Sequence, residues 1–530
     1  MDKLKKQARY EMHKYWGKKP PEQLKSLLDE YSKEGDIVLD PFAGYGVFIG
    51  EAFINKRNAI ANDLNPAACF IQKQLLVSEI DIEELANIAS NIIHSLENVD
   101  KFWNTISCPL CNEDAKIIVT LRHNNNNPTK CKIKCSCTKR MIEHQLSNTE
   151  ISKLLKKEKE EIIPEHPVSS IMHNSRISAK KNMNTDDLFT IRTLSMHISL
   201  LNKINELEDK VYRDLLLLAF TANLANCSRL VPPIKSRGDM APGTWMTGFY
   251  VGETYLENSV LHYFKNRVVK LISGKKDFLK QLNDNSIKKS DYQASSIAEI
   301  KKNKLNYLLN NADTKKLPYP NNSIDYIFTD PPYGDSVPYF EQSIIWNTWL
   351  NLSVDYTNEV VISDSKERNK KSQSFSEDME LCISEIYRVL KINKYFSITF
   401  HSISGAEWYA ILNGCLKNNF ILHKMEWLTQ KTFTPRQLNR TKTVKGDMLI
   451  TFKKGKNKNK HILLSKEETE SLIIKITEKL LHSNNLADTN TIYMALLQEF
   501  FSEHLIIENI NIINILTNNF SINEAGLWYI

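Results

Sequence analysis

Short apolar runs that stop at prolines, glycines or acidic residues mark the strands of this chain. The runs Ile37–Asp40 (IVLD), Ala59–Asp63 (AIAND), Asp325–Thr329 (DYIFT) and Tyr395–Phe400 (YFSITF) predict buried strands. A glycine turn after the first run leads into an apolar helical stretch, VFIGEAFINK, and a helix starts at two prolines near residue 20. Strands that alternate with helices in this way predict an α/β fold with an open sheet.

The run that ends at Asp63 lies far along the chain from the run that ends at Thr329. We therefore expect one sheet in two halves, residues 1–80 and 300–455, interrupted by an insertion over residues 81–299. The segments ILHKMEW and DMLITFKK predict the last two strands. A lysine-rich run near residue 455 precedes apolar helical segments, which predict a C-terminal helical domain over residues 460–530.

Charge and cysteine content narrow the class of protein. The net charge of +7 suits a polyanionic partner. No apolar run is long enough to span a bilayer, and the basic N-terminus lacks the apolar core of a secretory signal. Five of the nine cysteines fall between Cys108 and Cys137, which favours a metal site in a reduced compartment over disulfides. We expect a cytoplasmic protein without membrane contact.

Paired cysteines predict a zinc ribbon at residues 105–140 within the insertion. The predicted ligands are Cys108, Cys111, Cys135 and Cys137. The second pair is C-x-C, so Cys131 is an alternative to one of them. The cations around the ribbon are Lys130, Lys132, Lys134, Lys139 and Arg140. Either these cations contact DNA phosphates or the ribbon only stabilises the insertion.

The segment Asp40–Gly46 (DPFAGYG) predicts a nucleoside site between the first strand and its helix. Glycines there let the backbone approach a ligand closely. Asp63 follows about 20 residues later at the end of the second strand, where a carboxylate binds ribose hydroxyls. The full dinucleotide pattern G-x-G-x-x-G is absent, which argues against NAD.

A proline turn follows the strand DYIFT and carries the candidate chemistry. Pro331 and Pro332 end the strand, because proline cannot donate to a sheet ladder. The turn offers the Asp330 carboxylate, the Pro331 carbonyl and the Tyr333 ring. Two acceptors and a stacking ring describe a grip on a planar heterocycle with an exocyclic amine.

The sequence Asp330-Pro331-Pro332-Tyr333 resembles the catalytic motif of bacterial DNA methyltransferases that modify adenine N6 or cytosine N4, and DPFAGYG resembles their S-adenosylmethionine motif. The resemblance implies a Rossmann-like class I methyltransferase sheet, with S-adenosylmethionine as cofactor. The cofactor-binding residues that it implies are His13, Tyr15, Trp16 and Lys18 in an N-terminal arm, Asp40, Pro41, Phe42, Ala43, Gly44 and Gly46 in the glycine loop, and Asp63, Leu64 and Asp313. Asp63 is expected at the ribose and Asp313 near the adenine.

The implied function is site-specific methylation of double-stranded DNA on a flipped base, most simply adenine N6. Cytosine N4 stays open, because the same grip serves both amines. A non-catalytic nucleic-acid-binding subunit of a defence complex is the alternative of another class. A restriction-modification or phage-defence context implies a nuclease or other defence subunits as partners. Zinc would then be structural, and the insertion would recognise the target.

Two further basic stretches are candidates for nucleic-acid contact. Cations and aromatic residues alternate in the loop from Arg229 to Tyr250, which includes Lys235, Arg237 and Trp245. A folded loop fixed by Trp245 is the alternative. The second stretch is the basic loop from Thr434 to Arg440.

Overall fold

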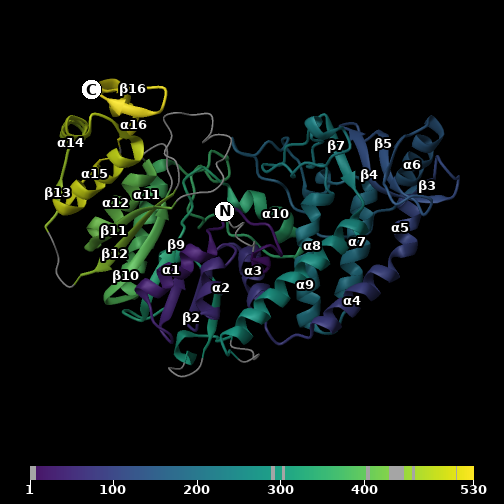
Figure 1. Ribbon diagram of the computed structural model, residues 1–530, viewed down its shortest axis with the longest axis horizontal. Coiled ribbons are helices and arrows are strands. Elements are labelled where there is room, and N and C mark those ends of the chain that lie inside the picture. Colours follow the sequence, from purple (N-terminus) through teal and green to yellow (C-terminus); the bar gives the residue numbers. More distant parts are fainter. Residues whose placement is uncertain are drawn as a thin grey trace. The chain divides into compact units, whose positions relative to one another are not determined.

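The structure is a computed structural model that describes residues 7–287, 293–300, 305–400, 406–428, 447–455, 460–508 and 510–530. The basic loop from Thr434 to Arg440 lies outside these residues. Contacts divide the chain into two compact units (Figure 1). The sheet unit comprises Gly17–Leu64, Tyr292–Val337 and Asp355–Ile530, and the insertion unit comprises Met1–Trp16, Asn65–Asp291 and Pro338–Val354. Among the helices described, none is long and apolar enough to cross a membrane.

A seven-stranded sheet in the order β11-β12-β10-β9-β1-β2-β8 organises the sheet unit. Its strands are β1 (Ile37–Asp40), β2 (Asn58–Asp63), β8 (Tyr307–Asn311), β9 (Ile324–Thr329), β10 (Leu390–Phe400), β11 (Phe420–Leu428) and β12 (Asp447–Lys454). The five strands from β10 to β8 pair in parallel, and β12 runs antiparallel between β10 and β11. This topology confirms the predicted Rossmann-like sheet.

The two faces of the sheet follow from the alternation of side chains along β9. Tyr326 and Phe328 point to one face, where both rings contact Phe48 of α2. Ile327 points to the other face and joins the apolar core beneath α11 and α12. The helices of the sheet are α1 (Pro21–Tyr31), α2 (Val47–Ile54), α11 (Ser372–Val389) and α12 (Ala406–Lys417). Helices therefore cover both faces of the sheet. The carboxyl ends of the strands remain as the place where a ligand can bind.

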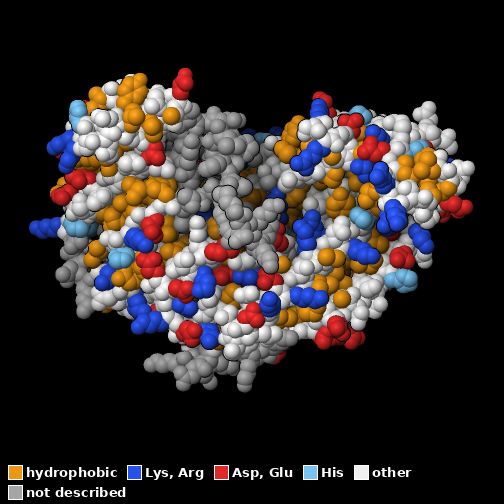
Figure 2. Space-filling model, in the orientation of Figure 1, with side chains coloured by type: hydrophobic (Ala, Val, Ile, Leu, Met, Phe, Trp, Pro, Cys, Tyr) orange, Lys and Arg blue, Asp and Glu red, His pale blue; other side chains and the backbone are white. Residues whose placement is uncertain are grey.

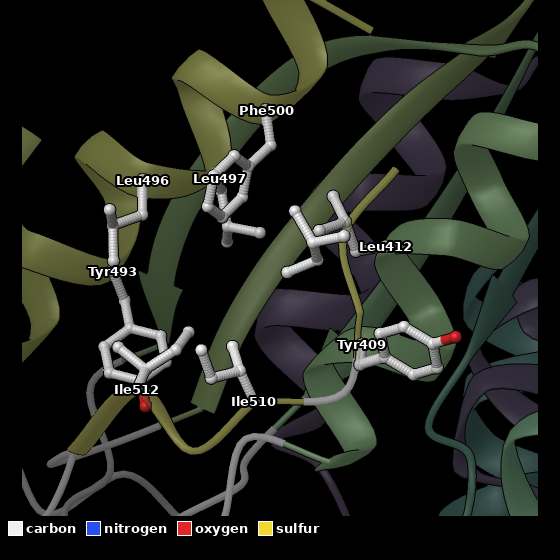
Figure 3. Close-up of a pocket in the computed structure, with 9 residues that line it drawn as sticks. Tyr409, Leu412, Tyr493, Leu496, Leu497, Phe500, Ile510 and Ile512 are labelled. Carbon is white, nitrogen blue, oxygen red and sulfur yellow. The ribbon is translucent and has the colours of Figure 1, made fainter. Parts of the chain in front are cut away.

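The C-terminal elements pack on α12 and β11 within the sheet unit. They are β13 (Ile462–Leu463), α14 (Lys466–Asn484), β14 (Ala487–Asp488), α15 (Thr489–Ser502), β15 (Leu505–Ile506), α16 (Ile512–Asn519), β16 (Ser521–Ile522) and β17 (Leu527–Tyr529). Figure 3 shows Leu412 of α12 and Leu497 and Phe500 of α15 around one small apolar pocket. These residues belong to the same hydrophobic core as the sheet.

The insertion unit contains a five-stranded antiparallel sheet and most of the long helices after β2. Its strands are β3 (Thr105–Ser107), β4 (Asp114–His123), β5 (Pro128–Lys134), β6 (Ile142–Gln145) and β7 (Thr254–Asn258). Its helices are α3 (Pro66–Leu76), α4 (Ile82–Ser95), α5 (Glu97–Asn104), α6 (Asn148–Glu160), α7 (Ile191–Asn205), α8 (Lys210–Leu224), α9 (Val260–Asp284) and α10 (Tyr339–Trp349). A buried ion network joins β4 and β7 to α6 and α7. Arg122 pairs with Glu257 and Glu158, and Arg192 also pairs with Glu257.

Candidate active site

The proline turn lies at the carboxyl end of β9, with its carboxylate tied to the neighbouring strand β10. Asp330 Oδ1 accepts hydrogen bonds from the hydroxyls of Tyr333 and Thr399, the latter at 2.8 Å. Thr399 is placed for this by the parallel register that pairs Ile398 with Thr329. Burial raises the pKa of Asp330, while the nearby Lys19 ammonium opposes that rise. Of the predicted catalytic residues, Asp330 and Tyr333 therefore belong to one hydrogen-bonded group, and Pro331 and Pro332 form the turn between them.

Lys19 reaches this group from the segment before α1. Its Nζ lies 3.1 Å from Asp330 Oδ1, 2.6 Å from Asp447 Oδ2 and 3.2 Å from the Tyr333 hydroxyl. Burial by itself lowers the pKa of Lys19, but the carboxylates of Asp330 and Asp447 raise it above its ordinary value. Sequence reasoning missed Lys19, Asp447 and Thr399. The only hint was the Lys18-Lys19-Pro20 step in the arm, and nothing local linked it to strands so far along the chain.

Asp40 links the glycine loop to the end of β9. Its Oδ1 accepts hydrogen bonds from the Phe42 amide at 3.1 Å and from the Thr329 hydroxyl at 2.9 Å. Burial, together with the charges of Asp330 and Asp63, raises the pKa of Asp40 to about 8. Asp40 is almost fully buried, so its observed role is to fix the loop beside β9.

The glycine loop has the shape of a nucleoside-binding turn. Gly44 and Gly46 have φ values of 51° and 87°, which disfavour residues with a side chain. The Gly44 amide donates to Asp63 Oδ2 at 2.7 Å, so the end of β2 sits against the loop. The Lys18 ammonium lies 3.9 Å from the centre of the Tyr45 ring. These residues fit an adenosyl cofactor: the backbone is accessible, and a partly exposed carboxylate stands where ribose hydroxyls bind.

The other predicted cofactor residues of the sheet unit lie at the same sheet edge. Pro41 and Ala43 are buried within the loop, and Phe42 is half-buried. The side-chain amide of Asn311 donates to the backbone carbonyls of Asp63 and Leu64, at 2.9 Å each. The partly exposed Asp313 follows β8, and its Oδ1 accepts a hydrogen bond from the Lys315 amide at 2.9 Å.

The aromatic residues of the arm pack within the insertion unit. Trp16 stacks on Trp346 of α10 with ring centres 5.1 Å apart, and Tyr15 stacks on Tyr339 of the same helix at 6.1 Å. His13 Nε2 lies 3.1 Å from the Thr221 hydroxyl. A cofactor role for these three residues stays a prediction.

The insertion unit brings four cysteine side chains together at two adjacent turns. Cys108 and Cys111 lie between β3 and β4, and Cys135 and Cys137 lie between β5 and β6. Their sulfur atoms all lie within 4.8 Å of one another, with Cys108–Cys137 at 3.7 Å and Cys111–Cys135 at 3.6 Å. Tetrahedral Zn–S bonds of about 2.3 Å put sulfur atoms about 3.8 Å apart, so the four side chains fit zinc. Cys131 lies outside this group, in the apolar core behind it.

The cations near the cysteines divide into two kinds. Lys130 and Lys132 both pair with Glu143, at 3.0 and 3.4 Å. Lys134, Lys139 and Arg140 are exposed. On the face shown in Figure 2, basic and acidic side chains are interspersed. Contact of this face with a polyanion would therefore depend on a few local cations.

The loop from Arg229 to Tyr250 also divides between structural and exposed residues. Arg229 donates to the carbonyls of Asp187 and Asn124, and Trp245 is buried. Lys235 and Arg237 are exposed, and half of the Tyr250 surface is accessible. Buried Trp245 and paired Arg229 agree with a folded loop, while nucleic-acid contact by the exposed residues stays a prediction.

Comparison with known proteins finds a likeness to DNA methylases over parts of the chain. The model of a DNA methylase family, the N6/N4 methyltransferases, matches residues 2–74 and 324–505, slightly less than half of the chain. A curated relative, the type II methyltransferase M.MjaII of Methanocaldococcus jannaschii, is 28% identical over 90 residues. That alignment covers 17% of this chain and 17% of the relative.

Two solved structures show weaker likeness. A protein from Thermus thermophilus, described as a candidate DNA modification methylase, is 13% identical with a TM-score of 0.18, over 31% of this chain and 61% of its own. An S-adenosylmethionine-dependent methyltransferase from Methanosarcina mazei is 10% identical with a TM-score of 0.17, over 29% and 69%. The Rossmann-like fold is shown by the strand order of the seven-stranded sheet itself.

Proposed function

We propose that this protein methylates an exocyclic amine of a base in double-stranded DNA, with adenine N6 as the first choice. The match of residues 2–74 and 324–505 to the model of the N6/N4 DNA methylase family supports this proposal. The observation that carries the proposal is the group at the end of β9, where Asp330 and Tyr333 stand beside the glycine loop and Asp63. The curated relative is named a type II methyltransferase, which supports a restriction-modification or defence context.

S-adenosylmethionine, held by the glycine loop and Asp63, would supply a methyl group on a positively charged sulfur. Asp330 and the Pro331 carbonyl would accept the two N–H hydrogen bonds of the target amine. These bonds hold the nitrogen lone pair out of conjugation with the ring. The lone pair would then be free to take the methyl group, with the C–S electron pair left on the neutral thioether sulfur, and the Asp330 carboxylate would accept the proton that nitrogen loses. Tyr333 would stack on the base, which must leave the duplex to reach this turn.

Charge at the turn favours this reaction. Asp330 and Asp447 contribute two negative charges and Lys19 one positive charge, so this trio carries one net negative charge where the nitrogen becomes positive. Preorganised charge of this kind stabilises a transition state without reorganisation. Cytosine N4 has the same two N–H donors, so the base is decided by contacts to the rest of the ring.

We propose that the four-cysteine group holds one structural zinc ion and that the insertion unit contacts DNA. Support for DNA contact comes from the exposed Lys134, Lys139 and Arg140 beside the cysteines, and from Lys235 and Arg237. Cations in these positions bind phosphates without reading sequence. The methyl step itself uses no zinc, because the sulfonium is already a strong electrophile.

The test is transfer of tritium from labelled S-adenosylmethionine to mixed-sequence duplex DNA, followed by separation of the nucleosides. We expect label in N6-methyldeoxyadenosine, and a loss of at least about 100-fold in Asp330→Ala. Lys25→Met is the control, because the exposed Lys25 pairs with Asp29 on the next turn of α1, away from Asp330. Label in N4-methyldeoxycytidine would show that the target base is cytosine. Binding of cofactor and DNA without transfer would favour the non-catalytic subunit.

A further inference from the structure

The buried lysine at the catalytic turn is the feature that the proposed reaction leaves unexplained. The exposed fractions of the Lys19, Asp447 and Asp330 side chains are 9%, 7% and 17%. A buried ammonium is costly unless it is paired, and here it bridges two carboxylates and a phenol. Lys19 also comes from an extended stretch before α1, outside the strands that form the turn.

We propose that Lys19 is a positioning residue, which keeps Asp330 ionised and oriented as the acceptor for the target amine, and that Asp447 shares its charge. The inference rests on the proposed function, since it assigns the acceptor role to Asp330. Lys19 acts through Asp330 and not on the base.

The geometry gives Lys19 this role in two ways. Its Nζ binds the same oxygen, Asp330 Oδ1, that Thr399 and Tyr333 donate to, so three donors fix the carboxylate. Three donors to Oδ1 restrict rotation of the Asp330 carboxylate. The direction in which the carboxylate can accept a hydrogen bond from the target amine is therefore fixed. A carboxylic acid at this position would instead offer a proton to the amine, which is the wrong polarity for an acceptor.

The second way is charge. Asp330 and Asp447 contact one ammonium, and two carboxylates this close cannot both ionise without a cation between them. Within the described residues, the charged and titratable groups near Asp330 include Lys19, Asp447, Tyr333 and Asp40. Of these, the Lys19 charge and the Tyr333 hydrogen bond favour the ionised form of Asp330, while the Asp447 carboxylate opposes it.

Two substitutions should therefore move the pH dependence in opposite directions. Lys19→Met removes the cation, so the acid limb of the kcat profile moves up by about 1 to 3 pH units. Asp447→Asn removes the repelling carboxylate while Lys19 still pairs with Asp330, so the acid limb moves down. Lys19→Arg keeps the charge and should retain a limb close to that of the wild type.

The experiment measures methyl transfer to duplex DNA from pH 5 to 9.5 for the full chain and these variants, with Lys25→Met as control. Opposite shifts of the limb for Lys19→Met and Asp447→Asn support the inference. A folded Lys19→Met whose rate falls by one constant factor at every pH overturns it, and so does an Asp447→Asn limb that does not move down. If Lys19→Met does not fold, Asp447→Asn and Lys19→Arg still decide the question.

A second readout does not depend on turnover. In Lys19→Met the pKa of folded Asp330 rises further above its unfolded value, so this variant loses stability as pH rises through that range. The Tm difference from wild type should grow between pH 5 and 8, and this growth should vanish in an Asp330→Asn background. Growth that persists without Asp330 overturns the inference. If the wild type methylates no nucleoside, the proposed function is refuted. The Tm series would still test whether Lys19 controls the ionisation of Asp330.

Discussion

The buried ion network of the insertion unit makes the sharpest stability prediction. Glu257 is 2% exposed and pairs with the guanidinium groups of Arg122 and Arg192, which are also buried. It accepts a further hydrogen bond from the Thr190 hydroxyl. The substitution Glu257→Gln keeps the shape and removes the charge, so Arg192 loses its carboxylate partner while Arg122 keeps Glu158.

Two independent arguments give the magnitude. Burial by itself raises the pKa of Glu257, but Arg122 and Arg192 outweigh it and lower the pKa from 4.5 to about 2. At 1.36 kcal/mol per pH unit this shift is worth about 3 kcal/mol. Removal of one partner from a buried pair costs about 3 to 5 kcal/mol. The stabilisation is present above pH 4.5 and is lost as the pH falls through about 2.

The assay is hydrogen–deuterium exchange of the β4 and β7 amides, because two units need not unfold together. We expect the free energy of opening to fall by about 3 kcal/mol in Glu257→Gln, with β1 and β2 unchanged. Glu160→Gln is the control, since Glu160 is exposed and its pair with Lys156 is worth less than about 1 kcal/mol. A fall below about 1 kcal/mol, or an equal fall in β1 and β2, would refute the reasoning.

Three further predictions concern the turn, the cysteines and a buried lysine. Tyr333→Phe keeps the ring but removes the hydroxyl bonded to Asp330, so kcat/KM should fall about 10-fold or more. Tyr333→Ala also removes the ring, which should cost about 1 to 3 kcal/mol more in stacking with the base. Equal losses of kcat/KM in the two variants would contradict stacking. Metal analysis should find one zinc per chain, lost in Cys111→Ser and kept in Cys131→Ala; zinc retained by Cys111→Ser would rule out the proposed ligand set. Lys275 donates to the carbonyls at the end of α3, at 3.0 Å for Gln74 and Leu75. Lys275→Met should therefore lower the opening free energy of α3 amides by about 2 kcal/mol or more, and unchanged exchange would contradict this.

Local sequence was sufficient for the strands and motifs of the sheet unit. The run DYIFT ends at two prolines, and β9 ends at Thr329 as this chemistry requires. Glycines at positions 44 and 46 predicted a turn where the backbone approaches a ligand closely, and both have positive φ. The paired cysteines indicated four ligands, and their sulfur atoms lie together. Each of these features depends on residues close in the chain or on backbone conformations that few residues adopt.

Only the tertiary structure decided which distant residues contact the proline turn after β9. Lys19, Thr399 and Asp447 come from the segment before α1, from β10 and from β12, and they meet Asp330 because the strand order brings those ends together. It also separated Cys131 from the ligand group, since alternation along β5 turns that side chain into the core. A charged side chain in a sequence carries no mark of its partner, because pairing is fixed by the packing of whole elements.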